Sequence, residues 1–207
     1  MKKYEMTEEI KIFEGKILHR IIALVDIPMH SVKAGDLGGW IECENNLSHN
    51  GDAWVYGDAR VYGDAWVSGD AWVYGDARVY GAAGVAGGAR VYGEAQVYGD
   101  ARVYGAAWVY DDARVYGAAR VSGEAQVRGD VGDTSPLQIQ GTRWVCNMAS
   151  RTIWRMGCCF YNLKEWVERF DEITAKNKQE DIKDEYWRYV RLACEMYAPE
   201  LLEGIKK

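Results

Sequence analysis

The sequence lacks any long apolar segment. No run approaches the roughly 18 apolar residues that a membrane-spanning helix requires. The first ten residues, MKKYEMTEEI, carry two lysines and three glutamates in place of the apolar stretch of a secretory signal. We therefore expect a protein that has no membrane segment and stays in the cytoplasm.

Basic charge and paired cysteine motifs are also missing. The formal net charge is -6, which argues against binding of duplex nucleic acid through a basic surface. The five cysteines are odd in number and none lies in a CxxC motif. We expect reduced thiols rather than disulfides or a thiolate metal site.

Histidine is scarce, and its placement matters for catalysis. The three histidines, His19, His30 and His49, all precede residue 51. General-base catalysis most often uses histidine, and catalytic zinc sites use it as a ligand. A Gly-rich phosphate loop, a Ser-His-Asp order and an HExxH motif are absent as well. The sequence therefore predicts a protein that is not an enzyme, with no catalytic residues, no metal and no cofactor.

What the sequence has instead is a six-residue repeat. From Gly51 to Arg128 the pattern Gly-[Asp/Glu/Ala/Gly]-Ala-[Trp/Arg/Gln/Gly]-Val-[Tyr/Ser/Ala/Arg] occurs thirteen times, and only Asp111 replaces the leading glycine. Strand alternation sends Ala and Val to one side and the variable residues to the other. Glycine tolerates positive φ, and aspartate can bond its own backbone at a corner. We predict an Ala/Val core with Gly-Asp turns.

Alanine and valine are too small to fill a sandwich of two sheets, but they fit inside a narrow coil of three short strands. The pattern resembles the hexapeptide-repeat superfamily, in which an aliphatic residue is followed four positions later by a small one, as in Val55 and Ala59. The resemblance implies a left-handed parallel β-helix with three hexads per coil. We predict a mainly β fold with an N-terminal β cap in residues 1–50, the β-helix in 51–133, and a small C-terminal α+β module in 134–207.

If three hexads form one coil, every third hexad lies on the same face. The first face is then an aromatic strip, made of Trp54, Tyr56, Trp72, Tyr74, Tyr92, Trp108 and Tyr110. The second carries an arginine ladder beside a tyrosine ladder, made of Arg60, Tyr62, Arg78, Tyr80, Tyr98, Arg114 and Tyr116. The third has a notch of small residues at Gly84 and Ala86, where another group could approach closely.

Each of the first two faces has two interpretations. The aromatic strip is either packed, in a homo-oligomer or under the C-terminal module, or it is a ligand or partner surface. For the oligomer we favour a trimer, with a dimer as the alternative. The second face is either a stabilising stack or a site for an anion or nucleotide, with arginine on phosphate and tyrosine on a base. The corner aspartates are interpreted as solvated turn residues rather than Ca²⁺ ligands.

A distinctive segment, VKAGDLGGWIE, stands at residues 32–42, ahead of Asn46-Leu47-Ser48 and the repeat. With these features the chain resembles a family of hexapeptide-repeat proteins of bacteriophages, prophages and enterobacterial genomes. The resemblance covers about residues 4–133 and implies a capped β-helix, but no activity. Many hexapeptide-repeat proteins are acyltransferases and some are carbonic anhydrases. Both activities need surface histidines, which the repeat lacks.

The C-terminal segment has a different composition. Two β-like runs, at 137–148 and 151–160, suggest a hairpin, and apolar spacing predicts two helices, the first with Asn162 as N-cap. The adjacent Cys158 and Cys159 are interpreted as packing residues.

From these observations we predict a non-catalytic binding protein encoded by a phage. It would block or sequester a target in the bacterial host, either a host protein or a small anionic or nucleotide signalling molecule, through the outer faces of the coil. The alternatives are a structural or assembly scaffold and a degenerate hexapeptide-repeat acyltransferase.

Overall fold

The computed structural model describes residues 2–133, 135–178 and 180–203. The chain divides into two compact units, Met1–Pro136 and Leu137–Lys207, so the cap and the repeat belong to one unit. Thr134, at the predicted start of the C-terminal module, lies outside the described residues. Among those residues, no helix has the length and apolar character needed to cross a bilayer.

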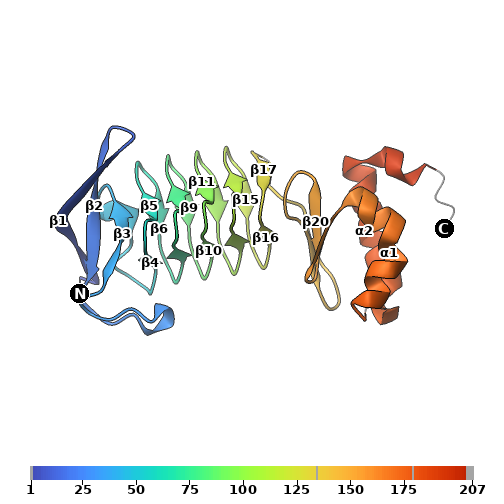
Figure 1. Ribbon diagram of the computed structural model, residues 1–207, viewed down its shortest axis with the longest axis horizontal. Helices are drawn as coiled ribbons and strands as arrows, with labels where there is room; N and C mark the ends of the chain where they lie inside the picture. Colours follow the sequence, from blue (N-terminus) through green and yellow to red (C-terminus); the bar gives the residue numbers. More distant parts are fainter. Residues whose placement is uncertain (1, 134, 179, 204–207) are drawn as a thin grey trace. The chain divides into compact units, whose positions relative to one another are not determined.

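The first unit is a parallel β-solenoid with a cap at its N-terminal end (Figure 1). Its strands are two residues long and begin six residues apart. They are β4 (Trp54–Val55), β5 (Arg60–Val61), β6 (Trp66–Val67), β7 (Trp72–Val73), β8 (Arg78–Val79), β9 (Gly84–Val85), β10 (Arg90–Val91), β11 (Gln96–Val97), β12 (Arg102–Val103), β13 (Trp108–Val109), β14 (Arg114–Val115), β15 (Arg120–Val121) and β16 (Gln126–Val127), followed by the longer β17 (Asp130–Gly132).

Pairing between coils confirms the predicted parallel β-solenoid. Trp54 lies opposite Trp72, eighteen residues later, and the same step relates all paired strands from β4 to β16. The step is 20 residues from β3 (Leu37–Ile41) to β5, and the register shifts between β14 and β17. Three stacked sheets result: β4-β7-β10-β13-β16 carries the first face, β5-β8-β11-β14-β17 the second and β6-β9-β12-β15 the third. The solenoid makes about five turns, because strands from the cap and β17 extend the coils of the repeat. The handedness stays a prediction.

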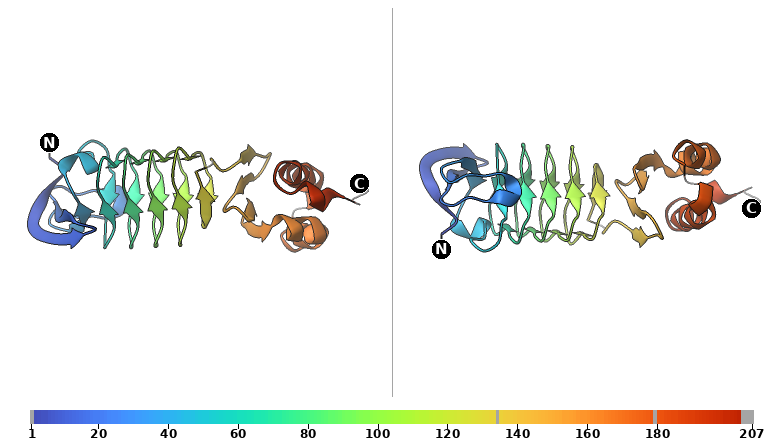
Figure 2. Two further views of the ribbon diagram at one scale, coloured as in Figure 1. Left: turned by 90° about the horizontal axis from the view of Figure 1, so that it is seen from above. Right: turned by 90° about the horizontal axis from the view of Figure 1, so that it is seen from below.

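The interior of the coil is thin and uniform. All thirteen alanines at the third position of the repeat and all thirteen valines at the fifth are at most 1% exposed. The strand geometry therefore leaves the fourth and sixth positions, which vary, to form the outer surface. Figure 2 shows the coils as a regular stack.

The corners explain why glycine leads each hexad. The leading glycines have φ between 61° and 74°, a region that residues with a Cβ rarely adopt. A Cβ at Gly69 would also come within 2.9 Å of the backbone nitrogen of Gly87 on the next coil. Asp111, the one exception in the repeat, adopts φ 57°.

The cap continues one sheet of the solenoid. It consists of β1 (Tyr4–Phe13), β2 (Lys16–Ala23), the 3-10 helix η1 (Pro28–His30), β3 (Leu37–Ile41) and the 3-10 helix η2 (Glu44–Asn46). Strands β1 and β2 form an antiparallel hairpin within the predicted N-terminal β cap, with Glu14 and Gly15 at positive φ in its turn. Strand β2 pairs antiparallel with β3, and β3 pairs parallel with β5.

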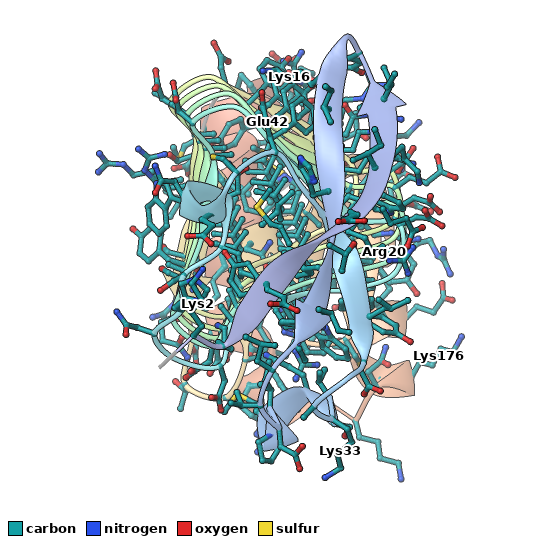
Figure 3. All side chains as sticks on the ribbon, turned by 90° about the vertical axis from the view of Figure 1, so that its left-hand side faces the viewer. Lys2, Lys16, Arg20, Lys33, Glu42 and Lys176 are labelled. Carbon is teal, nitrogen blue, oxygen red and sulfur yellow. The ribbon has the colours of Figure 1, made fainter. Side chains whose placement is uncertain are left out.

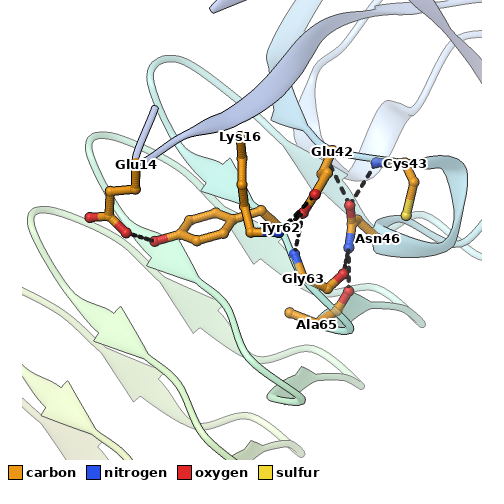
Figure 4. A network of polar contacts seen from close by, with 8 residues as sticks. All are labelled: Glu14, Lys16, Glu42, Cys43, Asn46, Tyr62, Gly63 and Ala65. Atoms are coloured by element: carbon orange, nitrogen blue, oxygen red, sulfur yellow. Dashed lines mark hydrogen bonds and ion pairs between the residues drawn. The ribbon is translucent and has the colours of Figure 1, made fainter. Parts of the chain in front are cut away.

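Side chains of the cap bond to the backbone of the first coil (Figure 4). The Asn46 amide donates to the carbonyls of Gly63 and Ala65 at 3.0 and 2.7 Å, and the Glu42 carboxylate accepts from the Gly63 nitrogen at 2.7 Å. Lys3 Nζ donates to the carbonyls of Gly51 and Ala53 at 3.1 and 2.7 Å. An additional coil at this end would bond to these backbone groups, and the side chains of the cap bond to them in its place.

The second unit is a small α+β module. An antiparallel sheet of β18 (Gln138–Gln140), β19 (Val145–Met148), β20 (Ile153–Met156) and β21 (Cys159–Asn162) precedes α1 (Leu163–Lys176), η3 (Glu180–Ile182), α2 (Lys183–Tyr197) and η4 (Pro199–Leu202). The predicted simple hairpin is corrected to this four-stranded meander, because each β-like run contains a turn. Asn162 caps α1 as predicted, accepting from the Glu165 nitrogen at 2.8 Å.

Candidate ligand-binding faces of the solenoid

The hairpin tip packs against the N-terminal end of the second face. The guanidiniums of Arg60 and Arg78 lie 4.5 and 5.2 Å from the Phe13 ring centroid. Tyr62 is only 4% exposed, and its hydroxyl donates to Glu14 Oε2 at 3.1 Å. Phe13 and Glu14 of the hairpin therefore contact three of the seven residues predicted to bind an anion. These three are Arg60, Tyr62 and Arg78.

The tyrosines of the second face stack on one another. Ring centroids are 5.1 Å apart between Tyr62 and Tyr80, 4.9 Å between Tyr80 and Tyr98, and 5.0 Å between Tyr98 and Tyr116. Tyr80 and Tyr98 thus have a ring on both sides. Burial raises the pKa of both hydroxyls above the ordinary tyrosine value. Arg114 is exposed at this face. The arrangement favours the stabilising stack over a base-binding ladder.

The first face is also largely stacked or covered by the cap. Trp54 is fully buried and packs edge-on against Tyr4, with ring centroids 6.4 Å apart. Trp72 lies under the His30 ring at 5.0 Å. Trp54 is therefore not part of an outer surface, contrary to our expectation for this face. Its cover includes Tyr4, which the spacing of the repeat gives no reason to expect there.

Further along the first face the aromatic residues remain half-buried. Tyr74, Tyr92 and Tyr110 form a second stack, with ring centroids 4.8 and 5.3 Å apart. Burial raises the pKa of Tyr92 to about 12. The Arg90 guanidinium lies 5.1 Å from the ring of Trp108. Tyr56, by contrast, is exposed.

One hollow lies between the cap and the first face. Its volume is about 580 Å³, and its lining includes Arg20, His30, Val32, Asp36, Tyr56 and Trp72. Several of these residues come from the VKAGDLGGWIE segment or the loop before it. In Figure 3, Arg20 lies on the hairpin. Lys33, which follows the lining residue Val32 in sequence, lies at the lower end of the cap, away from Lys16 and Glu42. Burial lowers the pKa of His30, whose ring stacks on Trp72.

A second hollow opens on the third face, at the notch the sequence predicts. Its volume is about 430 Å³, and it is lined by Gly84, Ala86, Trp66, Arg102, Val103, Tyr104 and Arg120. Gly84 and Ala86 sit on β9 and directly after it, between the coil that carries Trp66 and the coil that carries Tyr104. Trp66, Arg102, Tyr104 and Arg120 were not among the predicted site residues. Their grouping around the notch is visible only once the three faces are separated.

The two arginines of this hollow differ in the contacts that their guanidinium groups make. The Arg102 guanidinium lies 5.6 Å from the Trp66 ring centroid and donates to the Ala82 carbonyl. Arg120 is exposed, and its guanidinium makes no hydrogen bond or ion pair with the part of the chain that the structure describes. Trp66 lies directly over Gly84, where a Cβ would come within 2.5 Å of the indole Cζ2. The hollow therefore combines an apolar floor with two cationic groups.

The three histidines pack or bond within the cap region. His19 Nδ1 is 3.2 Å from the carbonyl oxygen of Thr7, His30 stacks on Trp72, and His49 stacks on Tyr4 at 4.3 Å. Over residues 2–133, 135–178 and 180–203, no three His, Cys, Asp or Glu side chains are grouped as metal ligands would be.

Comparison with known proteins places this geometry beside one repeat family. Residues 53–69, 71–87, 95–111 and 107–123 match the family model described as "YdcK Beta solenoid repeat". The coiled region is similar to the YdcK β-solenoid repeat. A curated protein of Escherichia coli (strain K12), named "Uncharacterized acetyltransferase YdcK", is 36% identical over 64 residues, which are 27% of this chain and 19% of that protein.

All four matches to the repeat model lie within the coil. The chain spans about a fifth of the length of this curated relative. The two matches support a β-solenoid repeat family, and the word acetyltransferase belongs to the relative's name. The matched YdcK-type repeats begin at residue 53, after the VKAGDLGGWIE segment, so a phage or prophage origin stays a prediction.

Proposed function

We propose that this protein is a non-catalytic binding protein that holds a small anionic ligand in the hollow of the third face. The observation that carries the proposal is the exposed guanidinium of Arg120, which has no hydrogen-bond or ion-pair partner among the described residues, at the edge of an apolar hollow that also contains Arg102. On the second face, by contrast, Arg60 and Arg78 are packed against the hairpin. A guanidinium pairs well with carboxylate or phosphate.

The distribution of acidic corners supports an anion at this place. The second position of the hexad is acidic in nine copies and neutral in four, namely Ala82, Gly88, Ala106 and Ala118. All four neutral copies lie at corners that border the third face. The corner between the first two faces keeps Asp58, Asp76, Glu94 and Asp112. The other corners that border the third face keep Asp52, Asp64, Asp70, Asp100 and Glu124. In a chain of net charge -6, the partial loss of carboxylates near two arginines makes the hollow less unfavourable for an anion than the corner between the first two faces.

The third face differs from the other two in a way that the core does not require. The alanines and valines are buried identically in every copy, so the fold tolerates any outward residue that fits the strand. The small side chains at Gly84 and Ala86, together with fewer acidic corners on this face, therefore suggest selection for a ligand there. We propose in addition that the ligand comes from a bacterial host, as the sequence interpretation predicts.

Purification from bacterial cells followed by native mass spectrometry tests the proposal. We expect the wild-type protein to carry an added mass of a few hundred daltons, and the double variant Arg102→Ala/Arg120→Ala to lose it. Arg114→Ala is the matched control, because it removes an exposed arginine from the second face and should retain the added mass. An added mass that persists in the double variant and disappears in the control would place the site on the second face instead.

The relative's name favours one second candidate, an acyltransferase. Such an enzyme would need a general base, and the described histidines are each engaged with an aromatic ring or a carbonyl. We expect no release of free thiol from acetyl-CoA above the blank. Turnover that is lost in His30→Ala would favour the enzyme over the binding protein.

A further inference from the structure

We propose that the ligand of the third face is a planar aromatic phosphate of the purine nucleotide class, whose ring stacks on Tyr104 above Ala86. This inference rests on the proposed function and adds the chemical class of the ligand. Its starting point is a difference between the three faces in the sixth position of the hexad.

On the first two faces this position carries stacked tyrosines. Successive rings, such as Tyr74 and Tyr92 or Tyr80 and Tyr98, have centroids 4.8 to 4.9 Å apart and planes within 3° of parallel. The spacing follows from the coil, because each ring stands one strand further along the stack. Tyrosines on adjacent coils stack in this way from Tyr62 to Tyr116 on the second face and from Tyr74 to Tyr110 on the first. Tyr56, at the N-terminal end of the first face, is exposed and does not join its stack.

On the third face the corresponding residues are Ser68, Ala86, Tyr104 and Ser122. Tyr104 is 42% exposed, and its ring contacts no other aromatic ring in the described part of the chain. Ala86 stands on the neighbouring coil, with its nitrogen bonded to the carbonyl of Val103. Ala86 thus occupies the position from which a tyrosine would stack on Tyr104.

The space left above Ala86 is part of the hollow of about 430 Å³. This volume lies within the range of small-molecule sites, roughly 300 to 1,000 Å³. A planar ring that enters it can stack on Tyr104 as the tyrosines of the other faces stack on each other. The indole of Trp66 lines the same hollow and limits how far the ring can slide.

The charged groups define the rest of the ligand. Arg120 lies one coil beyond Arg102, and both border the hollow. A guanidinium binds a phosphate through two parallel hydrogen bonds, which fits a phosphate joined to the stacked ring by a short linker such as ribose. Base stacking on an aromatic side chain with arginine on phosphate is a common mode of nucleotide binding.

Isothermal titration with three probes tests the inference: adenosine monophosphate, ribose 5-phosphate and inorganic phosphate. We expect the nucleotide to bind wild-type protein at least tenfold more tightly than either probe without a base. Ala86→Tyr supplies the missing ring from the protein itself and should weaken nucleotide binding at least tenfold. Ser122→Tyr adds the same side chain to the same column outside the hollow and should leave binding unchanged.

The outcomes separate this inference from the proposed function. If all three probes bind equally and Ala86→Tyr has no effect, the anion site stands and the stacked ring is wrong. If adenosine monophosphate and both probes without a base all fail to bind at millimolar concentration, the nucleotide class is overturned and the anion site loses its support. An unchanged circular dichroism spectrum and melting temperature for Ala86→Tyr would confirm that lost binding comes from a filled site.

Discussion

The corner glycines of the solenoid are constrained twice, by backbone conformation and by the approach of the next coil. Gly69 has φ 67°, and a Cβ there would lie 2.9 Å from the nitrogen of Gly87. Gly88 follows one of these corner positions, but its φ is not in the left-handed region, and the nearest atom to a Cβ would be 3.6 Å away. The backbone therefore requires glycine at Gly69, whereas the position of Gly88 has room for a Cβ.

At this scale we expect Gly69→Ala to lower the free energy of unfolding by about 1–2 kcal/mol or more, because the left-handed region disfavours a Cβ and the contact adds to that cost. Gly88→Ala is the matched control. It should be neutral or stabilising by about 0.4–1 kcal/mol, because alanine restricts the unfolded chain. Urea unfolding of both variants checks this, and equal losses would contradict the distinction.

At the scale of elements, the cap contains a buried lysine. Lys3 is 5% exposed, and its ammonium group bonds to two carbonyls of the first coil. Burial lowers the pKa of Lys3 to about 8, against the opposing effect of the Asp52 and Asp70 carboxylates. The Lys3 backbone nitrogen donates to His49.

The lowered pKa predicts how stability varies with pH. Below pH 8 the lysine is protonated in both the native and the unfolded chain. Between pH 8 and the unfolded value near 10.5, only the unfolded chain keeps the proton, so raising the pH favours the native state. From pH 8 to 9.5 we expect Lys3 to contribute a gain of up to about 2 kcal/mol to the free energy of unfolding, measured as the difference between wild-type protein and Lys3→Met. The buried thiols of Cys146, Cys159 and Cys194, whose native pKa values are raised, oppose this gain equally in both proteins.

Urea unfolding of wild-type protein and Lys3→Met at pH 7.0, 8.5 and 9.5 measures this dependence. The variant should lack the gain, and parallel curves for the two proteins would refute the role of Lys3. The series stops below pH 10 because several tyrosines have a raised native pKa. Once the unfolded chain loses those protons, the native state is destabilised for a separate reason.

The parts of the fold that follow from a local repeat could be predicted from the sequence. Alternation along each hexad puts Ala and Val inside, and the three-hexad period sorts the outer residues into faces. The notch at Gly84 and Ala86 was predicted in the same way, as the place where the third face loses its large side chains. These inferences depend only on residues close in sequence or separated by a fixed interval.

Contacts from outside the repeat could not be predicted in this way. Phe13 packs on Arg60, and Tyr4 packs on Trp54, across separations of more than 40 residues with no periodic relation. The hairpin therefore altered the second face in a way that its own residues did not indicate. In the second unit, the run 137–148 looked like one strand because the turn between β18 and β19 interrupts it only briefly.

At the scale of the whole molecule, the predicted homo-oligomer stays a prediction, with a trimer favoured and a dimer as the alternative. The structure narrows which residues of the aromatic face can take part. Trp54 is buried within the chain, and Trp72 is stacked under His30. Trp108 is half-buried and has Arg90 beside it. An intermolecular contact on this face would therefore centre nearer Trp108.

We expect Trp108→Ala to shift the mass measured by light scattering toward the 23.4 kDa monomer while the fold is kept. Trp54→Ala should instead destabilise the chain by about 3–5 kcal/mol, because it empties a fully buried site. An oligomer that survives Trp108→Ala with unchanged mass would remove the first face as its interface.

The identical core of every hexad makes the effect of a length change depend on its size. Inserting or deleting six residues would leave each alanine and valine inside, yet move every later outward side chain to the neighbouring face. Inserting eighteen residues, one full coil, would leave the faces aligned and lengthen the stacks on them. Gain or loss of whole hexads can therefore reshuffle or extend the surface of this protein without requiring its interior to be rebuilt.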